Sequence, residues 1–145
     1  MGRRLLIAVV AVVVVALAGW QFATRMFMAA PGGLDLSLSK KSENGLYAVT
    51  LTPEAAPVKQ GPLQSFVLTV RMPDGQPAEI SRIEVGGGMP KHGHGLPTEP
   101  RVTKALGDGK YRIEGFKFTM SGWWRLTFTI DAPPGRDEAD FNIVL

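Results

Sequence analysis

Cysteine is absent from the 145-residue sequence. Its absence excludes disulfides, thiolate metal sites and a lipid-modified cysteine anchor. Any metal site would therefore have to use histidine, methionine or carboxylate ligands. Histidine is almost as scarce, with two residues in the whole chain. Both lie in one short stretch, "MPKHGH", which makes that stretch the first candidate for a functional site.

Charge is absent from residues 5–24, "LLIAVVAVVVVALAGWQFAT". A helix of twenty residues at about 1.5 Å per residue is roughly 30 Å long, which matches the hydrocarbon core of a bilayer. Arg3 and Arg4 precede this run and favour a cytoplasmic N-terminus with the remainder exported. Trp20 and Phe22 fall where an interfacial aromatic belt would lie. The pattern therefore predicts a transmembrane helix over residues 5–24.

This reading divides the chain into three parts. Residues 1–28 would form a single-pass anchor in the inner (cytoplasmic) membrane, residues 29–33 a linker, and residues 34–145 one domain in the periplasm or outside the cell. The alternative is a cleaved signal peptide, because Ala16-Leu17-Ala18 has the small-x-small form of a cleavage site. The retained anchor is favoured, since the sequence after that tripeptide is still largely apolar. Both readings export residues 31–145.

A block of basic residues is also missing. Arg3, Arg4 and Arg25 account for the whole net charge of +3, so residues 31–145 are formally neutral. Without a basic stripe, nucleic-acid binding has little support. The exported part is nevertheless long enough to bury a core without cross-links. We expect a neutral, self-supporting domain.

No amphipathic helix is evident after residue 28, and the sequence instead alternates between apolar and polar residues in short runs. Turn signals separate these runs, above all Asn44-Gly45, Pro73-Asp74-Gly75 and Gly107-Asp108-Gly109. The spacing predicts an all-β fold, an antiparallel β-sandwich of immunoglobulin-like type. Residues 133–138 are expected to be a polar turn. The expected strands are 34–39, 45–51, 63–72, 78–85, 101–106, 110–118, 122–130 and 139–145.

Alternation also predicts which side chains face the core. These are Leu34, Leu36, Leu38, Tyr47, Val49, Leu51, Phe66, Leu68, Val70, Ile83, Val85, Trp124, Leu126, Phe128, Ile130, Phe141, Ile143 and Leu145. In the Trp123-Trp124 pair one ring should be buried. The other should face outward, either packed on a loop or part of a contact surface.

The candidate metal ligands are Met89, His92, His94 and Met120. His92 and His94 are two residues apart, so in extended backbone both imidazoles leave the same face and can reach one ion. Thioethers from Met89 and Met120 would complete a nitrogen–sulfur set that suits copper. The surrounding glycines would let the backbone bend around the ion. The alternative to a metal site is a solvated turn, with methionines that only fill the core.

Other chemistries are less well supported. Zinc lacks ligands for its tetrahedral shell, because Glu99 is the one carboxylate near the histidines in sequence. An enzyme is not expected: there is no cysteine nucleophile, no serine–histidine motif and no phosphate-binding glycine loop followed by a helix. The two functional readings that remain are a copper-handling protein and an interaction module that docks on a membrane complex.

The exported part resembles the YtkA-like family and the related FixH-like proteins. The resemblance is strongest over about residues 85–130 and rests on "GGGMPKHGHGLPTEPRV" followed by "LGDGKYRIEGFKFTMSGWWRLTFTI". The Met-Pro-x-His-x-His-Gly loop, the "GDGKY" hairpin and the "GWW" strand come in the order that the family shows. Residues 31–75 carry a generic strand pattern.

The resemblance implies a membrane-anchored, periplasmic, immunoglobulin-like sandwich. FixH-like proteins are linked to the assembly of cytochrome oxidases and their metal supply, and some relatives are associated with copper handling. Copper would accordingly be the metal held by the histidine loop. One residue departs from the pattern: many relatives have methionine where this chain has Leu96, which removes one soft ligand.

Overall fold

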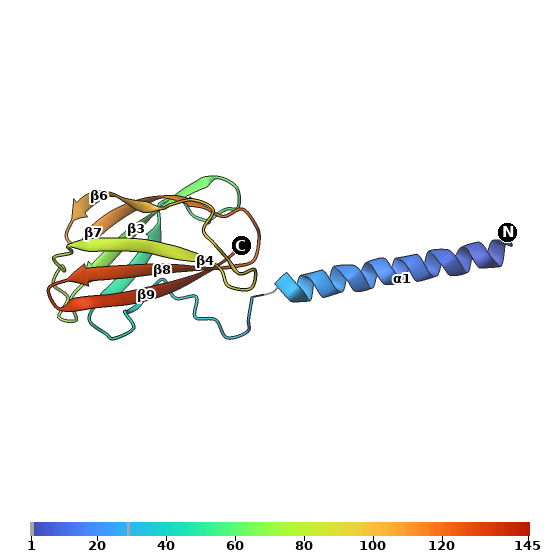
Figure 1. Cartoon of the computed structure of the whole chain (residues 1–145), viewed down its shortest axis with the longest axis horizontal. Coiled ribbons are helices and arrows are strands. Elements are labelled where there is room, and N and C mark those ends of the chain that lie inside the picture. The colour runs from blue at the N-terminus through green and yellow to red at the C-terminus, as the bar shows by residue number, and fades with distance from the viewer. Residues whose placement is uncertain (1, 29) are drawn as a thin grey trace.

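In the computed structural model, residues 2–28 and 30–145 are described, while the side chains of residues 3–6, 8 and 24–28 lie outside that description. A helix is followed by nine short strands in these described residues (Figure 1). The elements are α1 (Arg3–Met28), β1 (Ser39–Lys41), β2 (Ala48–Pro53), β3 (Leu63–Arg71), β4 (Arg82–Met89), β5 (His94–Gly95), β6 (Arg101–Gly107), β7 (Lys110–Lys117), β8 (Trp123–Ala132) and β9 (Gly135–Val144).

The strands form two antiparallel sheets, with the orders β1-β2-β3-β7-β6 and β5-β4-β8-β9. Their inner faces pack on one another through a single apolar core, so the prediction of an all-β sandwich is confirmed (Figure 1). Phe66, Phe116 and Phe118 form one aromatic cluster on the five-stranded side. Trp124 and Phe128 meet this cluster from β8.

The two ends of the sandwich differ in what they carry. One end, called here the hairpin end, holds the last residues of β4 and β9 and the first residues of β1, β3, β6 and β8. Register fixes this grouping, since Trp123 pairs with Val144 and Leu63 pairs with Lys117, and β7 runs directly into β8. The opposite end, called the far end, holds the turn at Asp108 and the β8–β9 turn.

The predicted N-terminal helix is present as α1, which extends away from the sandwich on the side of the hairpin end (Figure 1). Its described apolar side chains are exposed all round, from Ile7 to Phe22. The predicted span 5–24 falls partly on residues whose side chains lie outside the description. Within the described part of the chain, no helix combines the length and the apolar character that crossing a membrane requires.

The predicted core is largely confirmed. The inward residues expected in β2, β3 and β8 are all buried, and so are two of the three in the last strand, while Leu145 packs partly buried against the core. Ile83 and Val85 are likewise partly buried against it. The hairpin predicted at Gly107-Asp108-Gly109 is also present, with all three residues at positive φ. The alternation of apolar and polar residues predicts burial correctly in these segments because each strand has one face on the core.

The first predicted strand, residues 34–39, is wrong over most of its length. Strand β1 begins at Ser39, and Leu36 remains 53% exposed. The carboxylate of Asp35 accepts the amide of Ser37 at 2.8 Å. This local side-chain-to-backbone bond gives the backbone an alternative to strand pairing.

Other strand boundaries also differ from the prediction, and the strand expected over residues 78–85 begins only at Arg82. Strand β4 runs through Gly86, Gly87 and Gly88, which were expected to lie in a loop. Strand β9 begins at Gly135, so most of the expected polar turn 133–138 is paired strand. In both places polar or glycine-rich sequence enters a sheet because its backbone finds a partner in β8.

The β1–β2 connection is longer than a two-residue turn. Gly45 has the expected positive φ of 76°, whereas Asn44, for which a positive φ was also expected, does not have one. Its side-chain amide instead donates to the buried carboxylate of Asp137 in β9 at 2.9 Å. The backbone amides of Asn44 and Leu46 donate to the same carboxylate. Asp137 thereby fastens this turn to the other sheet.

Candidate metal centre

The histidines lie on a tight hairpin between β4 and β5. Met89 pairs with His94 across the two strands, and Gly88 pairs with Gly95. The Met89 carbonyl accepts the amides of His92 at 2.9 Å and of Gly93 at 3.0 Å, which closes the turn. Gly93 has a φ of 66°, a left-handed conformation that glycine adopts without steric cost.

Gly87 and Gly88 allow this hairpin to pack closely on its neighbours. A Cβ atom on Gly87 would lie 2.2 Å from the carbonyl oxygen of Arg125, and one on Gly88 would lie 2.2 Å from that of His94. Both distances are far inside van der Waals contact. These glycines therefore allow the close approach of β4 to β8 and β5, and their expected part in bending the backbone around an ion stays a prediction.

His92 and His94 come together, though not by the expected route. His92 lies in the turn and His94 opens β5, so the backbone between them is not extended. Their ring centroids are nevertheless 5.8 Å apart, and both side chains are exposed. An imidazole nitrogen binds a transition metal at about 2.0 Å, so two rings that share one ion keep their centroids within roughly 6 Å. The observed spacing lies inside that limit.

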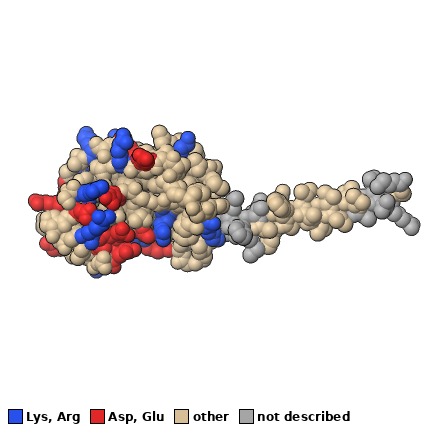
Figure 2. All heavy atoms as spheres, in the orientation of Figure 1, with Lys and Arg blue, Asp and Glu red and all other residues tan. Residues whose placement is uncertain are grey.

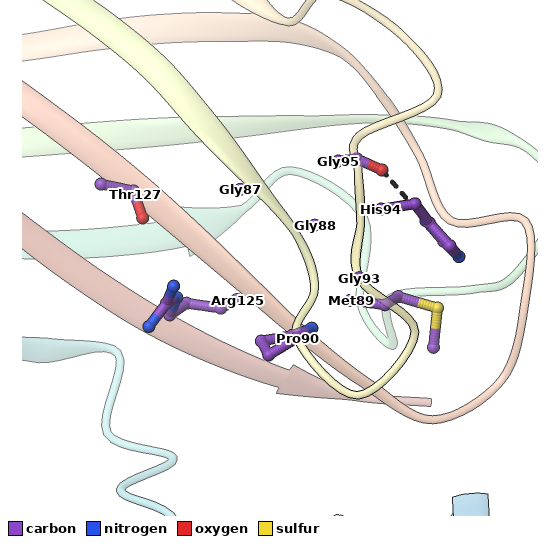
Figure 3. Close-up of a pocket in the computed structure, with 9 residues that line it drawn as sticks. All are labelled: Gly87, Gly88, Met89, Pro90, Gly93, His94, Gly95, Arg125 and Thr127. Carbon is purple, nitrogen blue, oxygen red and sulfur yellow. Dashed lines mark hydrogen bonds between the residues drawn. The ribbon is translucent and has the colours of Figure 1, made fainter.

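The orientation of the His94 ring is fixed on two sides. Its Nδ1 lies 3.2 Å from the carbonyl oxygen of Gly95 (Figure 3). Because a carbonyl can only accept, Nδ1 is the donor in this contact, and Nε2 is the ring nitrogen that a neutral imidazole would offer to a ligand. The ring also lies against Trp124, with 6.2 Å between centroids in an edge-to-face arrangement. Metal-binding histidines commonly have such a carbonyl partner on the second nitrogen.

Met89 lies on the same face of the hairpin as His94, because directly paired residues of antiparallel strands share a face. Figure 3 shows the Met89 thioether and the His94 ring extending to the same side of the hairpin. Met89 is 1% exposed and belongs to the core. The sulfur is thus at the boundary between the core and the exposed histidines.

Met120 is connected to the histidine hairpin by way of Trp124, which contacts both. Its carbonyl accepts the indole N–H of Trp124 at 3.0 Å, and its side chain is half-buried against the core. The sequence prediction placed Met120 at the same end of the fold as the histidines, and the structure agrees. Trp124 was predicted as a core residue, but its contact with His94 was not foreseen, because strand alternation says nothing about neighbours from another hairpin.

A shallow pocket of about 270 Å³ adjoins the hairpin (Figure 3). Its wall is mostly hairpin backbone, with His94 and Met89 on one side and Arg125 and Thr127 from β8 on the other. Arg125 lies 3.7 Å from the carboxylate of Asp140, which offsets part of its charge. Arg125 lines this pocket beside β4, and its side chain lies on the other side of the hairpin from the His94 ring and the Met89 thioether (Figure 3).

Carboxylates do not join the histidines. Among the described residues, no three histidine, aspartate or glutamate side chains converge on one point. Glu99 instead adjoins Gly115 in the five-stranded sheet. The side chains that this hairpin could offer to a metal are therefore imidazole and thioether, a combination that would suit copper better than zinc.

The outward ring of the tryptophan pair is Trp123, as alternation predicted. It is half-buried, and its indole N–H donates to the side-chain oxygen of Asn142 at 2.9 Å. The ring thus lies along β9 on the outer face of the four-stranded sheet. Its expected role in a contact surface stays a prediction.

One known protein family matches the part of the chain that carries this hairpin. The YtkA-like family model matches residues 40–129, which is more than half of the chain. The chain belongs to the YtkA-like family. In this YtkA-like protein the match runs from β1 into β8 and includes the histidine hairpin, while α1 and β9 lie outside it. No curated protein and no solved structure shows a significant match.

Proposed function

We propose that this YtkA-like protein handles copper through His92 and His94, with Met89 and Met120 as thioether donors. The observation that carries the proposal is the pair of exposed imidazoles 5.8 Å apart above a buried methionine that is paired with one of them. Two imidazoles suit both oxidation states of copper, and thioethers favour Cu(I). Copper would accept a nitrogen lone pair from each imidazole and would thereby link the two rings.

The exposure of the site fits transient binding. Both histidines face solvent, so an incoming protein could reach the ion without unfolding the domain. Met89 and the His94 ring have fixed positions, which lowers the ordering cost of binding. An open site with few ligands favours delivery or sequestration over permanent storage.

The proposal includes export and a membrane anchor. An isolated helix that is apolar on all sides needs an apolar phase around it, and the described side chains of α1 are exposed from Ile7 to Phe22. Arg3 and Arg4 precede it in sequence and favour a cytoplasmic N-terminus. The domain would then lie on the periplasmic or outer side of the inner membrane. The cellular role that we propose is aid to metal supply during assembly of a membrane complex such as a cytochrome oxidase, as the resemblance to FixH-like proteins implies.

The immunoglobulin-like classification also belongs to this proposal. Strands β2, β3, β7 and β6 on one sheet and β4, β8 and β9 on the other follow the A-B-E-D and C-F-G order of constant-type immunoglobulin domains. This order supports the classification. In that scheme the histidine hairpin is the turn after strand C.

The alternative is an interaction module without metal. The burial of Met89 and the packing of Trp124 on His94 favour it, because both contacts would also be made by a purely structural hairpin. Catalysis is not part of either reading. Among the described residues, neither histidine side chain hydrogen-bonds a serine hydroxyl or a carboxylate, as a nucleophile–base pair would require.

Competition titration with Cu(I) and Cu(II) on the purified full chain tests the proposal. His92→Ala and His94→Ala should each weaken Cu(II) binding strongly, because each removes half of the imidazole donors. Lys91→Ala, between Pro90 and His92 in the same turn, is the matched control and should leave the affinity unchanged. Equal copper affinity in the parent and in a His92→Ala/His94→Ala double variant would reject copper handling at this hairpin and leave the interaction module.

A further inference from the structure

The chain after α1 enters the sandwich at the hairpin end. The carbonyl of Asp35 already accepts the side-chain amide of Asn142 in β9 at 2.8 Å. Six residues separate Met28, the last residue of α1, from Asp35. A fully extended chain of that length spans at most about 25 Å. The hairpin end is therefore held near the end of α1 whatever path the linker takes.

Exposed apolar side chains are concentrated at this end. After α1, the large hydrophobic residues exposed in the described chain are Leu36, Leu63, Leu106 and Val144. Leu63 opens β3 and Val144 closes β9, both at the hairpin end, and Leu63 is 66% exposed. Leu36 lies in the segment that leads into this end. Leu106 alone belongs to the far end.

Basic side chains surround these apolar residues. Lys59, Lys91, Arg101 and Lys117 are all exposed in loops or strand termini of the hairpin end. Lys59, Arg101 and Lys117 form no ion pair with a described residue, and Glu99 is the one exposed acid among them that is not paired. Figure 2 shows acidic side chains gathered over the part of the sandwich that points away from α1. The far end holds the acids Glu43, Asp74, Glu79, Glu84, Asp108, Asp131, Asp137 and Glu138 together with the basic residues Lys41, Arg71, Arg82, Lys110 and Arg136.

We propose that the hairpin end of the sandwich rests on the anionic lipid surface of the membrane that holds α1. This inference rests on the anchoring included in the proposed function. Isolated apolar side chains surrounded by lysine and arginine are suited to a fluid, negatively charged headgroup layer. Such a layer attracts cations and needs no surface of complementary shape on the protein. Acids outnumber basic residues at the far end and several of its cations are ion-paired, so the hairpin end is attracted to this surface more strongly and the domain takes one orientation.

The orientation has a consequence for the histidine hairpin. His92 and His94 belong to the end that meets the lipid, so copper held there would lie at the membrane surface. The exchange partner would then be a protein whose metal site opens at that surface. A soluble carrier would approach the far end first and would not meet the histidines.

Absence of cysteine makes the orientation measurable. Ser121→Cys places a single thiol in the exposed loop before β8 on the hairpin end, and Glu79→Cys places one at the far end. Each full-length variant is labelled with a donor dye and reconstituted into vesicles of phosphatidylcholine, with or without phosphatidylglycerol. Energy transfer to an acceptor-labelled lipid then reports how near each end lies to the bilayer.

Phosphatidylglycerol should raise transfer from position 121 severalfold and lower transfer from position 79, and added salt should reverse both changes. A Lys59→Gln/Arg101→Gln/Lys117→Gln variant should lose this lipid dependence. The matched far-end variant, Lys41→Gln/Arg82→Gln/Lys110→Gln, should keep it. Lipid-independent transfer at position 121 would overturn the orientation and favour a protein partner for the exposed apolar residues.

Failure of the anchor would look different. If alkaline carbonate releases the full chain from the vesicles, or if mass spectrometry finds a mature N-terminus at Gly19 after expression, the anchoring proposal fails and the orientation fails with it. Retention after carbonate with lipid-independent transfer overturns the orientation alone.

Discussion

The indole of Trp124 connects two parts of the candidate site, because its N–H donates to the Met120 carbonyl and its ring lies edge-on to His94. The same ring is fully buried against Phe118 in the core. A single residue thus ties the position of the hairpin to the packing of the sandwich. Substitutions in the core around Trp124 are therefore expected to alter the position of the histidines.

Trp124→Ala should be among the most costly substitutions in the domain. Truncation of a fully buried Trp is expected to lower the free energy of unfolding by about 3–5 kcal/mol. Trp123→Ala, at the neighbouring half-buried position, is the matched control and should cost clearly less. Urea denaturation of residues 31–145, followed by circular dichroism, measures both. An equal or larger loss for Trp123→Ala would contradict the assignment of the buried ring.

Gly88→Ala should open the β4–β5 hairpin. The added Cβ would meet the His94 carbonyl oxygen at 2.2 Å, and the φ of 157° is one that other residues rarely adopt. We expect a loss of about 1–3 kcal/mol in stability together with weaker copper binding. Gly86→Ala in the same strand is the control, since its Cβ would come no nearer than 3.9 Å to Thr127. Unfolding free energies and copper titrations of the two variants should therefore diverge; similar values would show that the close approach does not matter.

Asp137 should make stability depend on pH in the acid range. Burial raises the pKa of Asp137, but hydrogen bonds from the Ser42 hydroxyl and from the amides of Asn44, Glu138 and Leu46 outweigh it and lower the pKa to about 2. Because this value is below that of an unfolded aspartate, 3.8, the folded state favours the ionised form. The contribution, about 2 kcal/mol, is complete above pH 3.8 and is lost as pH falls through about 2.

Asp137→Asn should remove that dependence and loosen the β1–β2 turn. Urea midpoints at pH 7 and at pH 3 measure the effect, with Glu79→Gln at an exposed position as the control. The parent and the control should both lose stability at the lower pH, and Asp137→Asn should lose less. Parallel losses in all three proteins would show that the carboxylate is not the responsible group.

Met89→Leu should weaken Cu(I) binding more than Cu(II) binding, because the thioether is a soft ligand. Stability should change by less than about 1.5 kcal/mol, since leucine nearly conserves the volume. Met72→Leu is the matched control, a partly buried methionine that packs against the same core at the far end. Both oxidation states are measured by competition with chelators of known affinity. A Cu(I) affinity that is the same in both variants would remove Met89 from the ligand set.

Sequence pattern predicted the sandwich well where burial alone decides the structure. The alternation in β8 placed Trp124 and Phe128 on the core, and both are fully buried. The same pattern gave wrong strand boundaries where hydrogen bonding to a neighbouring strand decides the structure. Residues 34–37 alternate but pair with no strand of the described chain, and Gly86–Gly88 belong to a strand because β8 lies beside them.

The sequence predicted which residues belong to the candidate site, but not how they are arranged in space. The scarcity of histidine pointed to the "MPKHGH" stretch, and the structure brings the two rings together. The turn at Gly93, the pairing of Met89 with His94 and the contact with Trp124 depend on how the hairpin closes and which strands adjoin it. No local spacing carries that information, because these contacts join residues from separate strands.

X-ray absorption spectroscopy of the copper-loaded full chain tests copper handling most directly. The account predicts imidazole scattering from two nitrogens, with a sulfur neighbour in the Cu(I) form that disappears in Met89→Leu or Met120→Leu. The His92→Ala/His94→Ala variant should show neither the imidazole signal nor stoichiometric copper. A parent spectrum with oxygen neighbours alone, unchanged in the double histidine variant, would contradict the account.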